Sequence, residues 1–95
     1  MTTYPDSESA QAVIEVLLKE RLAACIQEMP IKSHYVWEGA IQNESEVLLL
    51  IKGKSENFEV IKKAILAHHK YEVPEIIQLP VTSGLESYLS WLEGK

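Results

Sequence analysis

The chain has 95 residues, of which 46% are hydrophobic and 24% are charged, an ordinary composition for one globular domain. Its formal net charge of −5 argues against nucleic-acid binding, because a phosphate-binding face needs clustered cations. The single cysteine excludes an intrachain disulfide, and no apolar run approaches the roughly 20 residues that span a membrane. The first residues show no signal-peptide pattern, so we expect a cytoplasmic protein.

The N-terminal quarter of the chain predicts a short strand followed by a helix. Residues 1–4 are β-prone, and Asp6 or Ser7 can cap the segment that follows Pro5. Apolar residues then recur at helical spacing, with polar residues on the other side. A helix is therefore expected from about residue 7 to residue 21.

The middle of the chain predicts an antiparallel ribbon. A strand begins at residues 23–27, and Pro30 indicates an interruption, at an edge position or a bend, because proline has no N–H to donate to a ladder. Residues 32–41 are rich in aromatic and β-branched side chains. Residues 47–51 form a continuous apolar run, which is typical of a strand covered on both faces. The polar residues 42–45 between these two runs predict the hairpin connection.

The C-terminal half of the chain predicts two helices with a strand between them. Ser55 is the expected N-cap of the first of these helices. Its inner stripe is formed by Phe58, Ile61, Ala64, Ile65 and His68. The polar stretch 68–74 breaks this helix, residues 75–82 read as a strand, and residues 85–92 describe a short closing helix.

This order of elements predicts an α+β fold of the ferredoxin-like type, βαββαβ with an added C-terminal helix. Residues 1–95 form one domain in this interpretation. The helices cover one face of the sheet, yet the run 47–51 is apolar on both sides. A chain of this length has nothing left to cover the second face, so self-association is the economical answer.

Six stretches of the sequence closely resemble the CutA divalent-cation tolerance proteins. They are residues 2–6, 20–25, 35–39, 46–52, 71–76 and 88–92, in the same order and across almost the whole chain. The resemblance implies a ferredoxin-like fold, a tight homotrimer with a sheet-lined interior, and a link to copper and other divalent metals. It also implies an architecture similar to the trimeric PII signalling proteins. The family's first strand normally begins several residues earlier, so the first strand here is expected to be short or truncated.

Two adjacent histidines, His68 and His69, are the best metal candidates in the sequence. Imidazole suits copper, zinc and nickel, and the resemblance implies a copper site at this histidine pair in some family members. Adjacent helical residues point about 100° apart, so both could bind one ion only if the helix ends between them. In the alternative interpretation, His68 packs on the core face and His69 caps the helix C-terminus. Cys25 is more commonly a buried, inert thiol, although Cu(I) would favour it if it were reachable.

A second candidate site is a cleft between subunits that would bind a small anion or a metal–ligand complex. Its expected residues are Tyr35, Trp37, Glu38, Lys52, Tyr71 and Glu75. The same residues could instead form buried ion pairs and aromatic contacts that fix the packing. No nucleophile–base pair or phosphate loop stands out, so an enzyme is not expected.

The sequence therefore predicts a cytoplasmic homotrimer that acts in divalent-metal, chiefly copper, tolerance by binding the metal directly. The partner is the chain itself, with no nucleic acid and no membrane. The alternative is a non-enzymatic, PII-like signalling or scaffold trimer that binds a small ligand or a partner protein in its inter-subunit clefts.

Overall fold

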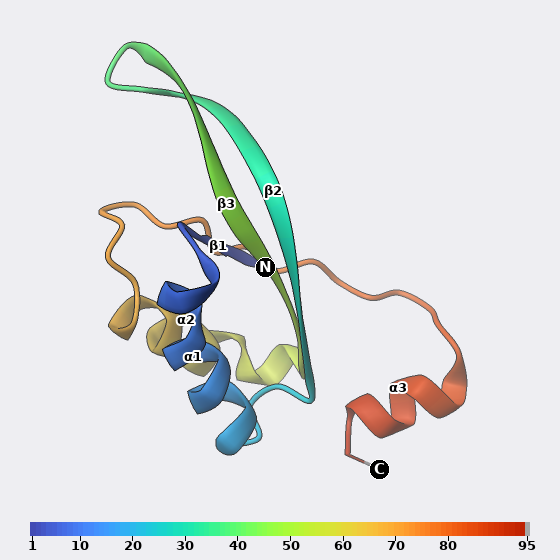
Figure 1. Ribbon diagram of the computed structural model, residues 1–95. Coiled ribbons are helices and arrows are strands. Elements are labelled where there is room, and N and C mark those ends of the chain that lie inside the picture. Colours follow the sequence, from blue (N-terminus) through green and yellow to red (C-terminus); the bar gives the residue numbers. More distant parts are fainter. Residues whose placement is uncertain (95) are drawn as a thin grey trace.

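The computed structural model describes residues 1–94 and shows a three-stranded antiparallel sheet with helices packed against it (Figure 1). In chain order the elements are β1 (Thr2–Tyr4), α1 (Ser7–Lys19), β2 (Cys25–Trp37), β3 (Ala40–Lys52), the 3₁₀ helix η1 (Ser55–Asn57), α2 (Phe58–Ala67) and α3 (Glu86–Leu92). The strand order is β1-β3-β2. The expected α+β class and the short first strand are confirmed.

The C-terminal strand expected at residues 75–82 is reduced to a single bridge. Ile76 pairs antiparallel with Thr2, and Met1 and Ile77 exchange two backbone hydrogen bonds of 2.9 and 3.1 Å. This segment lies at the outer edge of β1, which is where the fourth strand of a ferredoxin-like sheet belongs. The prediction of a full strand was wrong, because β1 offers only three residues to pair with and Pro80 has no N–H to donate.

The hairpin turns at Glu38 and Gly39, and the predicted connection at residues 42–45 was wrong. Glu38 and Gly39 have φ of 51° and 78°. Positive φ at both central residues is the mark of a two-residue type I′ turn, whose twist matches that of the strands. Residues 42–45 instead continue β3, with Ser45 opposite Lys32. Their polar character reflects their place on a hairpin that extends beyond the helices, as Figure 1 shows.

Strand β2 runs without a break through Pro30, which pairs with Val47. The predicted interruption at this proline was wrong, whereas its predicted edge position is confirmed, because β2 is an outer strand of the sheet. An outer strand tolerates proline since one side of its backbone needs no partner within the sheet.

The helix ends follow local chemistry. The Asp6 carboxylate accepts a 2.8 Å hydrogen bond from the Ser9 backbone N–H and caps α1 as expected. Helix α1 ends two residues before the predicted end, because Arg21 adopts a left-handed φ of 58°. Ser55 does not cap α2 but opens η1, and α2 begins only at Phe58.

The core lies between one face of the sheet and the two helices α1 and α2. Its buried side chains are Tyr4, Ala10, Val13, Leu17, Ala23, Leu49, Ile61 and Ile65. Because side chains alternate along a strand, Leu48 and Leu50 point to the opposite face, which α1 and α2 leave uncovered. The expectation that this run is apolar on both faces of the sheet agrees with this pattern. Helix α3 lies apart from α1 and α2, at the end of an extended segment (Figure 1).

Candidate functional site

The two adjacent histidines face different neighbours. Helix α2 ends at Ala67, so His68 is its exposed C-cap residue, and its Nδ1 lies 2.9 Å from the Ala64 carbonyl oxygen. His69 is half-buried. Its Nε2 lies 2.7 Å from the Thr3 carbonyl oxygen, and its ring stacks on Tyr4 with centroids 4.1 Å apart. The helix therefore does end at this pair, but the break turns the two rings toward different surroundings.

Both ring nitrogens of His69 take part in hydrogen bonds. A carbonyl oxygen can only accept, so Nε2–H donates to Thr3, while Nδ1 accepts from the Tyr71 backbone N–H at 3.2 Å. These bonds fix the ring of His69, which joins the loop after α2 to β1 as a structural residue. In His68 only Nδ1 contacts a backbone carbonyl oxygen. The Nε2 atom is therefore the nitrogen that can bind a metal ion.

The described residues, 1–94, contain no group of three or more His, Cys, Asp or Glu side chains that could hold a metal ion. Cys25 is half-buried at the start of β2, where it pairs with Lys52 at the end of β3. His34 lies on the hairpin, in β2 opposite Asn43, whereas His68 follows α2. Within the described residues, the chain therefore offers isolated metal-binding side chains rather than a complete set of ligands for one ion.

A pair of tyrosines and a pair of glutamates form the most developed polar cluster. The Tyr71 hydroxyl donates a 2.7 Å hydrogen bond to the carboxylate of Glu46, a residue that is only 9% exposed. Burial, reinforced by this hydrogen bond, raises the pKa of Tyr71 well above its usual range. Partial burial and a hydrogen bond with Glu44 raise the pKa of Tyr35 in the same direction. Both phenols therefore stay protonated and act as donors to carboxylates at neutral pH.

Glu44 and Glu46 were missed as site residues from the sequence alone. The available signal was the register of the apolar run: Glu46 lies two residues before Leu48, and therefore on the same face of β3. A carboxylate on an apolar face needs a hydrogen-bond donor to offset the cost of burial. Nothing in the sequence pattern identifies Tyr71, which is 25 residues away, as that donor.

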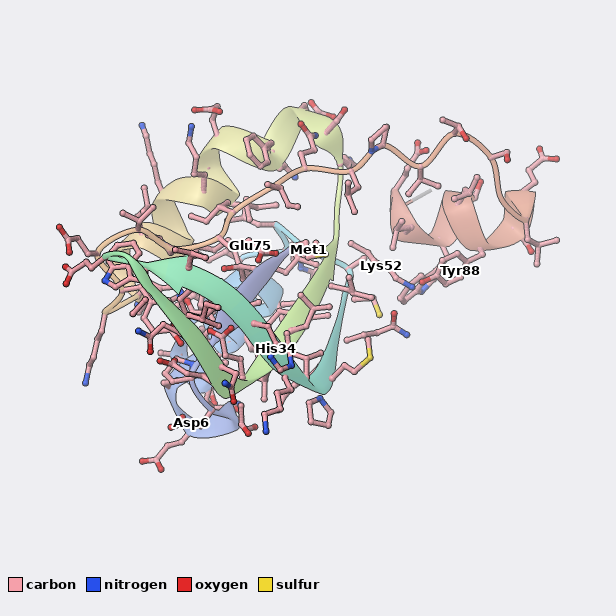
Figure 2. The ribbon with its side chains drawn as sticks, turned by 90° about the horizontal axis from the view of Figure 1, so that it is seen from above. Met1, Asp6, His34, Lys52, Glu75 and Tyr88 are labelled. Carbon is pink, nitrogen blue, oxygen red and sulfur yellow. The ribbon has the colours of Figure 1, made fainter. Side chains whose placement is uncertain are left out.

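Lys52 lies at the base of the hairpin and contacts α3. Its Nζ donates a 3.1 Å hydrogen bond to the Tyr88 hydroxyl and lies 5.3 Å from the centre of the Tyr88 ring, a contact visible in Figure 2. The hydrogen bond with Tyr88 raises the pKa of Lys52. This contact fastens α3 to the end of β3.

The six residues predicted to line one cleft are spread along one chain. Trp37 and Glu38 lie at the turn of the hairpin, whereas Lys52 pairs with Cys25 at its base. Strands rise about 3.3 Å per residue, so the two ends of this hairpin are roughly 40 Å apart. Glu75 lies near the N-terminal amine. Burial lowers the pKa of this amine, and the negative charge of Glu75 partly raises it again. Only Tyr35 and Tyr71 come together within the chain.

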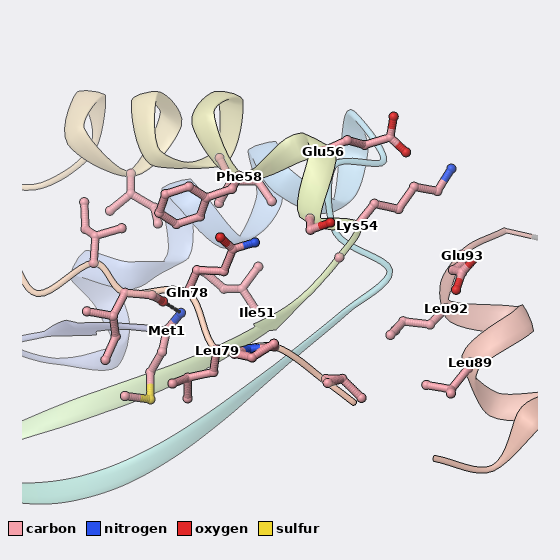
Figure 3. A pocket seen from close by; sticks show the side chains of 18 residues that line it. Met1, Ile51, Lys54, Glu56, Phe58, Gln78, Leu79, Leu89, Leu92 and Glu93 are labelled. Carbon is pink, nitrogen blue, oxygen red and sulfur yellow. Dashed lines mark hydrogen bonds between the residues drawn. The ribbon is translucent and has the colours of Figure 1, made fainter. Parts of the chain in front are cut away.

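An apolar hollow of about 780 Å³ lies beside the N-terminus, between the end of β3, α2, the segment after Ile76 and α3 (Figure 3). Its lining includes Met1, Ile51, Phe58, Ile61, Ile65, Ile77, Leu79, Val81, Leu89 and Leu92. Lys54, Glu56 and Glu93 supply the charged groups at its rim. This chemistry suits the packing of apolar side chains rather than the binding of a metal ion.

The comparisons with known proteins agree with the geometry of the sheet. The family model described as "CutA1 divalent ion tolerance protein" matches residues 1–95. The chain belongs to the CutA1 family. The description of the CutA1 family names a tolerance protein and no enzyme activity.

Named relatives in the CutA1 family match nearly all of the chain. The divalent-cation tolerance protein CutA of Pyrococcus horikoshii is 43% identical over 91 residues, which cover 96% of this chain and 89% of the relative. The chloroplastic protein CutA of Arabidopsis thaliana is 41% identical over 96% of this chain, but the chain spans only 50% of that relative.

Solved CutA1 structures share the fold. The divalent cation tolerance protein of Thermus thermophilus superposes with a TM-score of 0.92 at 39% identity, covering 98% of this chain and 91% of that one. A CutA protein of Archaeoglobus fulgidus, described as periplasmic, superposes with a TM-score of 0.91 at 36% identity, covering 96% and 89% of the two chains. Among residues 1–94, no helix is long and apolar enough to cross a membrane.

Proposed function

We propose that this chain is a cytoplasmic, non-enzymatic protein of divalent-cation tolerance that works as a homotrimer and binds a divalent cation, with copper as the first candidate. The observation that carries the proposal is the match of the whole chain to the CutA1 family model, together with relatives named for divalent-cation tolerance.

The oligomer is supported by the uncovered face of the sheet. Leu48 and Leu50 are only half-buried in one chain, and Met29 beside them is 45% exposed. On the other face of the sheet, where the hairpin extends beyond the helices, the paired residues Val36 and Ile41 are 69% and 80% exposed. Apolar surface of this extent on a small domain is typical of a contact between subunits. A second and a third copy would remove it from water.

Unpaired backbone edges support the same assembly. Within residues 1–94, strand β1 pairs only with Val47, Leu48 and Leu49, so the half of β3 nearer the turn has no partner on that side. In the same part of the chain, the outer edge of β2 is open along its length. The extended segment after Ile77 carries exposed Leu79 and Val81 and forms no ladder of its own within the described residues. We infer that this segment of one chain pairs with an open hairpin edge of a neighbour.

Metal binding is proposed at the C-terminal end of α2. His68 is exposed, and its Nε2 is free of the backbone contact that occupies Nδ1. Imidazole nitrogen is a good ligand for Cu²⁺ and Zn²⁺. His69 contributes only if one of its two hydrogen bonds is broken, so His68 is the primary ligand and the remaining ligands come from solvent or from another copy.

Isothermal titration calorimetry with Cu²⁺ and with Zn²⁺ tests the metal-binding proposal. We expect saturable binding by the wild-type protein and its loss in His68→Ala. The matched control is His34→Ala, because His34 is another exposed histidine on a different element. His69→Ala should lower the melting temperature clearly but should change the metal affinity little. Equal affinity in the wild type and His68→Ala would contradict direct binding at this position.

A signalling or scaffold trimer is the second candidate, and the polar cluster around Glu46 favours it. Tyr71, Glu46, Tyr35 and Glu44 combine phenol donors with carboxylates on the uncovered side of the sheet. Such a set could recognise a small ligand or a partner protein in a cleft between subunits. A ligand in a co-crystal structure that contacts Tyr35 and Tyr71, with no metal at His68, would favour this candidate over the first.

A further inference from the structure

A second hollow, of about 570 Å³, lies at the end of α1 and is lined by basic side chains. Lys19, Arg21 and Lys54 line it, against Glu93 as the one acidic residue of the lining. These are three of the nine lysines and arginines in a chain whose net charge is −5. Within residues 1–94, none of the three cationic groups has an ion pair or a side-chain hydrogen bond. Cations are therefore concentrated at one place without partners.

The floor of this basic hollow is a close approach of two backbone segments. A Cβ atom on Gly53 would lie 2.7 Å from the Leu22 carbonyl oxygen, so only glycine fits there. The Ala24 N–H donates a 3.0 Å hydrogen bond to the Lys52 carbonyl oxygen and holds the two segments together. Arg21 ends α1 with a left-handed φ of 58°. The backbone beneath the three cations is therefore fixed by contacts within the chain.

The position of two of the three cations is explained by the end of helix α1, but the position of the third is not. The C-terminal end of a helix favours nearby cations, which explains Lys19 in the last turn and Arg21 just beyond it. Lys54 comes from a different element, the residue before η1, and extends away from the sheet (Figure 3). Its presence beside the other two raises their mutual repulsion, and a bound anion would relieve that repulsion.

We propose that the basic hollow binds the phosphate group of a small anion. The Arg21 guanidinium supplies paired donors that match phosphate oxygens, and Lys19 and Lys54 supply compact positive charge from two other directions. Trp91, 54% exposed in α3, forms part of the wall and can cover the remainder of an organic phosphate. This site is separate from the metal ligand proposed at His68 and does not depend on it.

Trp91 also provides the measurement. In a Trp37→Phe background it is the only tryptophan, so its fluorescence reports on this hollow. Inorganic phosphate and ribose 5-phosphate are titrated separately at constant ionic strength, with calorimetry on the unaltered chain as a second measurement. Saturable binding of both probes is expected. Tighter binding of ribose 5-phosphate would identify an organic ester as the source of the phosphate group, and tighter binding of inorganic phosphate would identify the free ion.

Two sets of variants with the same change in net charge decide the proposal. The triple variant Lys19→Gln, Arg21→Gln, Lys54→Gln should bind both probes roughly tenfold more weakly or worse, since charged hydrogen bonds are lost. The control triple variant Lys32→Gln, Lys63→Gln, Lys70→Gln should bind as the parent does. If the triple variant folds poorly, Lys54→Gln replaces it in the test. This single variant should also weaken the binding of both probes. Equal affinity in the two triple variants, or no saturable binding of either probe, would overturn the proposal.

Discussion

The Tyr71 hydroxyl donates a 2.7 Å hydrogen bond to the Glu46 carboxylate and ties the loop after α2 to the central strand, one residue beyond the last β1–β3 pair. Glu46 is 9% exposed, so Tyr71→Phe would leave a buried charge without this donor. We expect the free energy of unfolding to fall by about 1–3 kcal/mol. Urea unfolding at pH 7 measures this loss. Tyr88→Phe, which removes an exposed hydroxyl, is the control and should cost clearly less; equal losses would contradict the role given to Glu46.

The Tyr4 hydroxyl presents the opposite case. It is buried and has no hydrogen-bond partner among the described residues, although its ring stacks on His69. Tyr4→Phe keeps the stacking and removes an unpaired polar group. We expect stability to stay the same or to rise by up to about 1 kcal/mol, because an unpaired buried hydroxyl is costly. A destabilisation larger than about 1 kcal/mol in the same urea experiment would show that this hydroxyl is paired in solution.

Buried tyrosines make stability depend on alkaline pH. Burial raises the pKa of Tyr4 to about 12, and burial together with Glu46 raises the pKa of Tyr71. Since the unfolded chain releases these protons near pH 10 and the folded chain does so only at higher pH, their contribution is complete below about pH 10. It is lost as the pH rises through the folded-state values.

Unfolding free energies measured between pH 8 and pH 12 test this dependence. The wild-type curve should fall above about pH 10, and the fall should be shallower in Tyr4→Phe and in Tyr71→Phe. Leu66→Ala, at an exposed residue of α2 that carries no titrating group, should follow the wild-type slope. Identical slopes in all four proteins would be inconsistent with burial as the cause.

The hairpin turn makes a prediction about its backbone. Glu38 holds a φ of 51°, which asparagine adopts more readily than glutamate. Glu38→Asn should therefore raise the unfolding free energy by roughly 0.5 kcal/mol, whereas Gly39→Ala should lower it by about 1 kcal/mol. Thermal melts at one protein concentration compare the two variants. The two substitutions should change the unfolding free energy in opposite directions. A stabilising Gly39→Ala would therefore refute the type I′ turn.

The sequence predicted those parts of the fold in which a residue's own neighbours decide its structure. The Asp6 cap and the helical spacing from Ala10 to Leu17 predicted α1, and the continuous apolar run from Val47 to Ile51 predicted a strand with two apolar faces. The turn at Glu38 and Gly39 was missed because the polar run at 42–45 looked more like a connection. A polar run on a projecting hairpin and a polar run in a turn have the same composition.

Sequence patterns could not predict the contacts between segments that are far apart in the chain. His68 and His69 are neighbours in the chain, but the Thr3 carbonyl oxygen and the Tyr71 N–H decide that His69 is structural. Likewise, the segment at 75–82 has the composition of a strand, but the short length of β1, together with Pro80, prevents a ladder. A partner strand must be present in the fold before such a segment can pair.

Sedimentation equilibrium of the purified chain tests the central claim most directly, namely that further copies cover the sheet face carrying Leu48 and Leu50. We predict one species with three times the 10.8 kDa chain mass, and a melting temperature that rises with protein concentration. A compact, soluble species of a single chain mass at the same concentrations, with a melting temperature independent of concentration, would contradict the account.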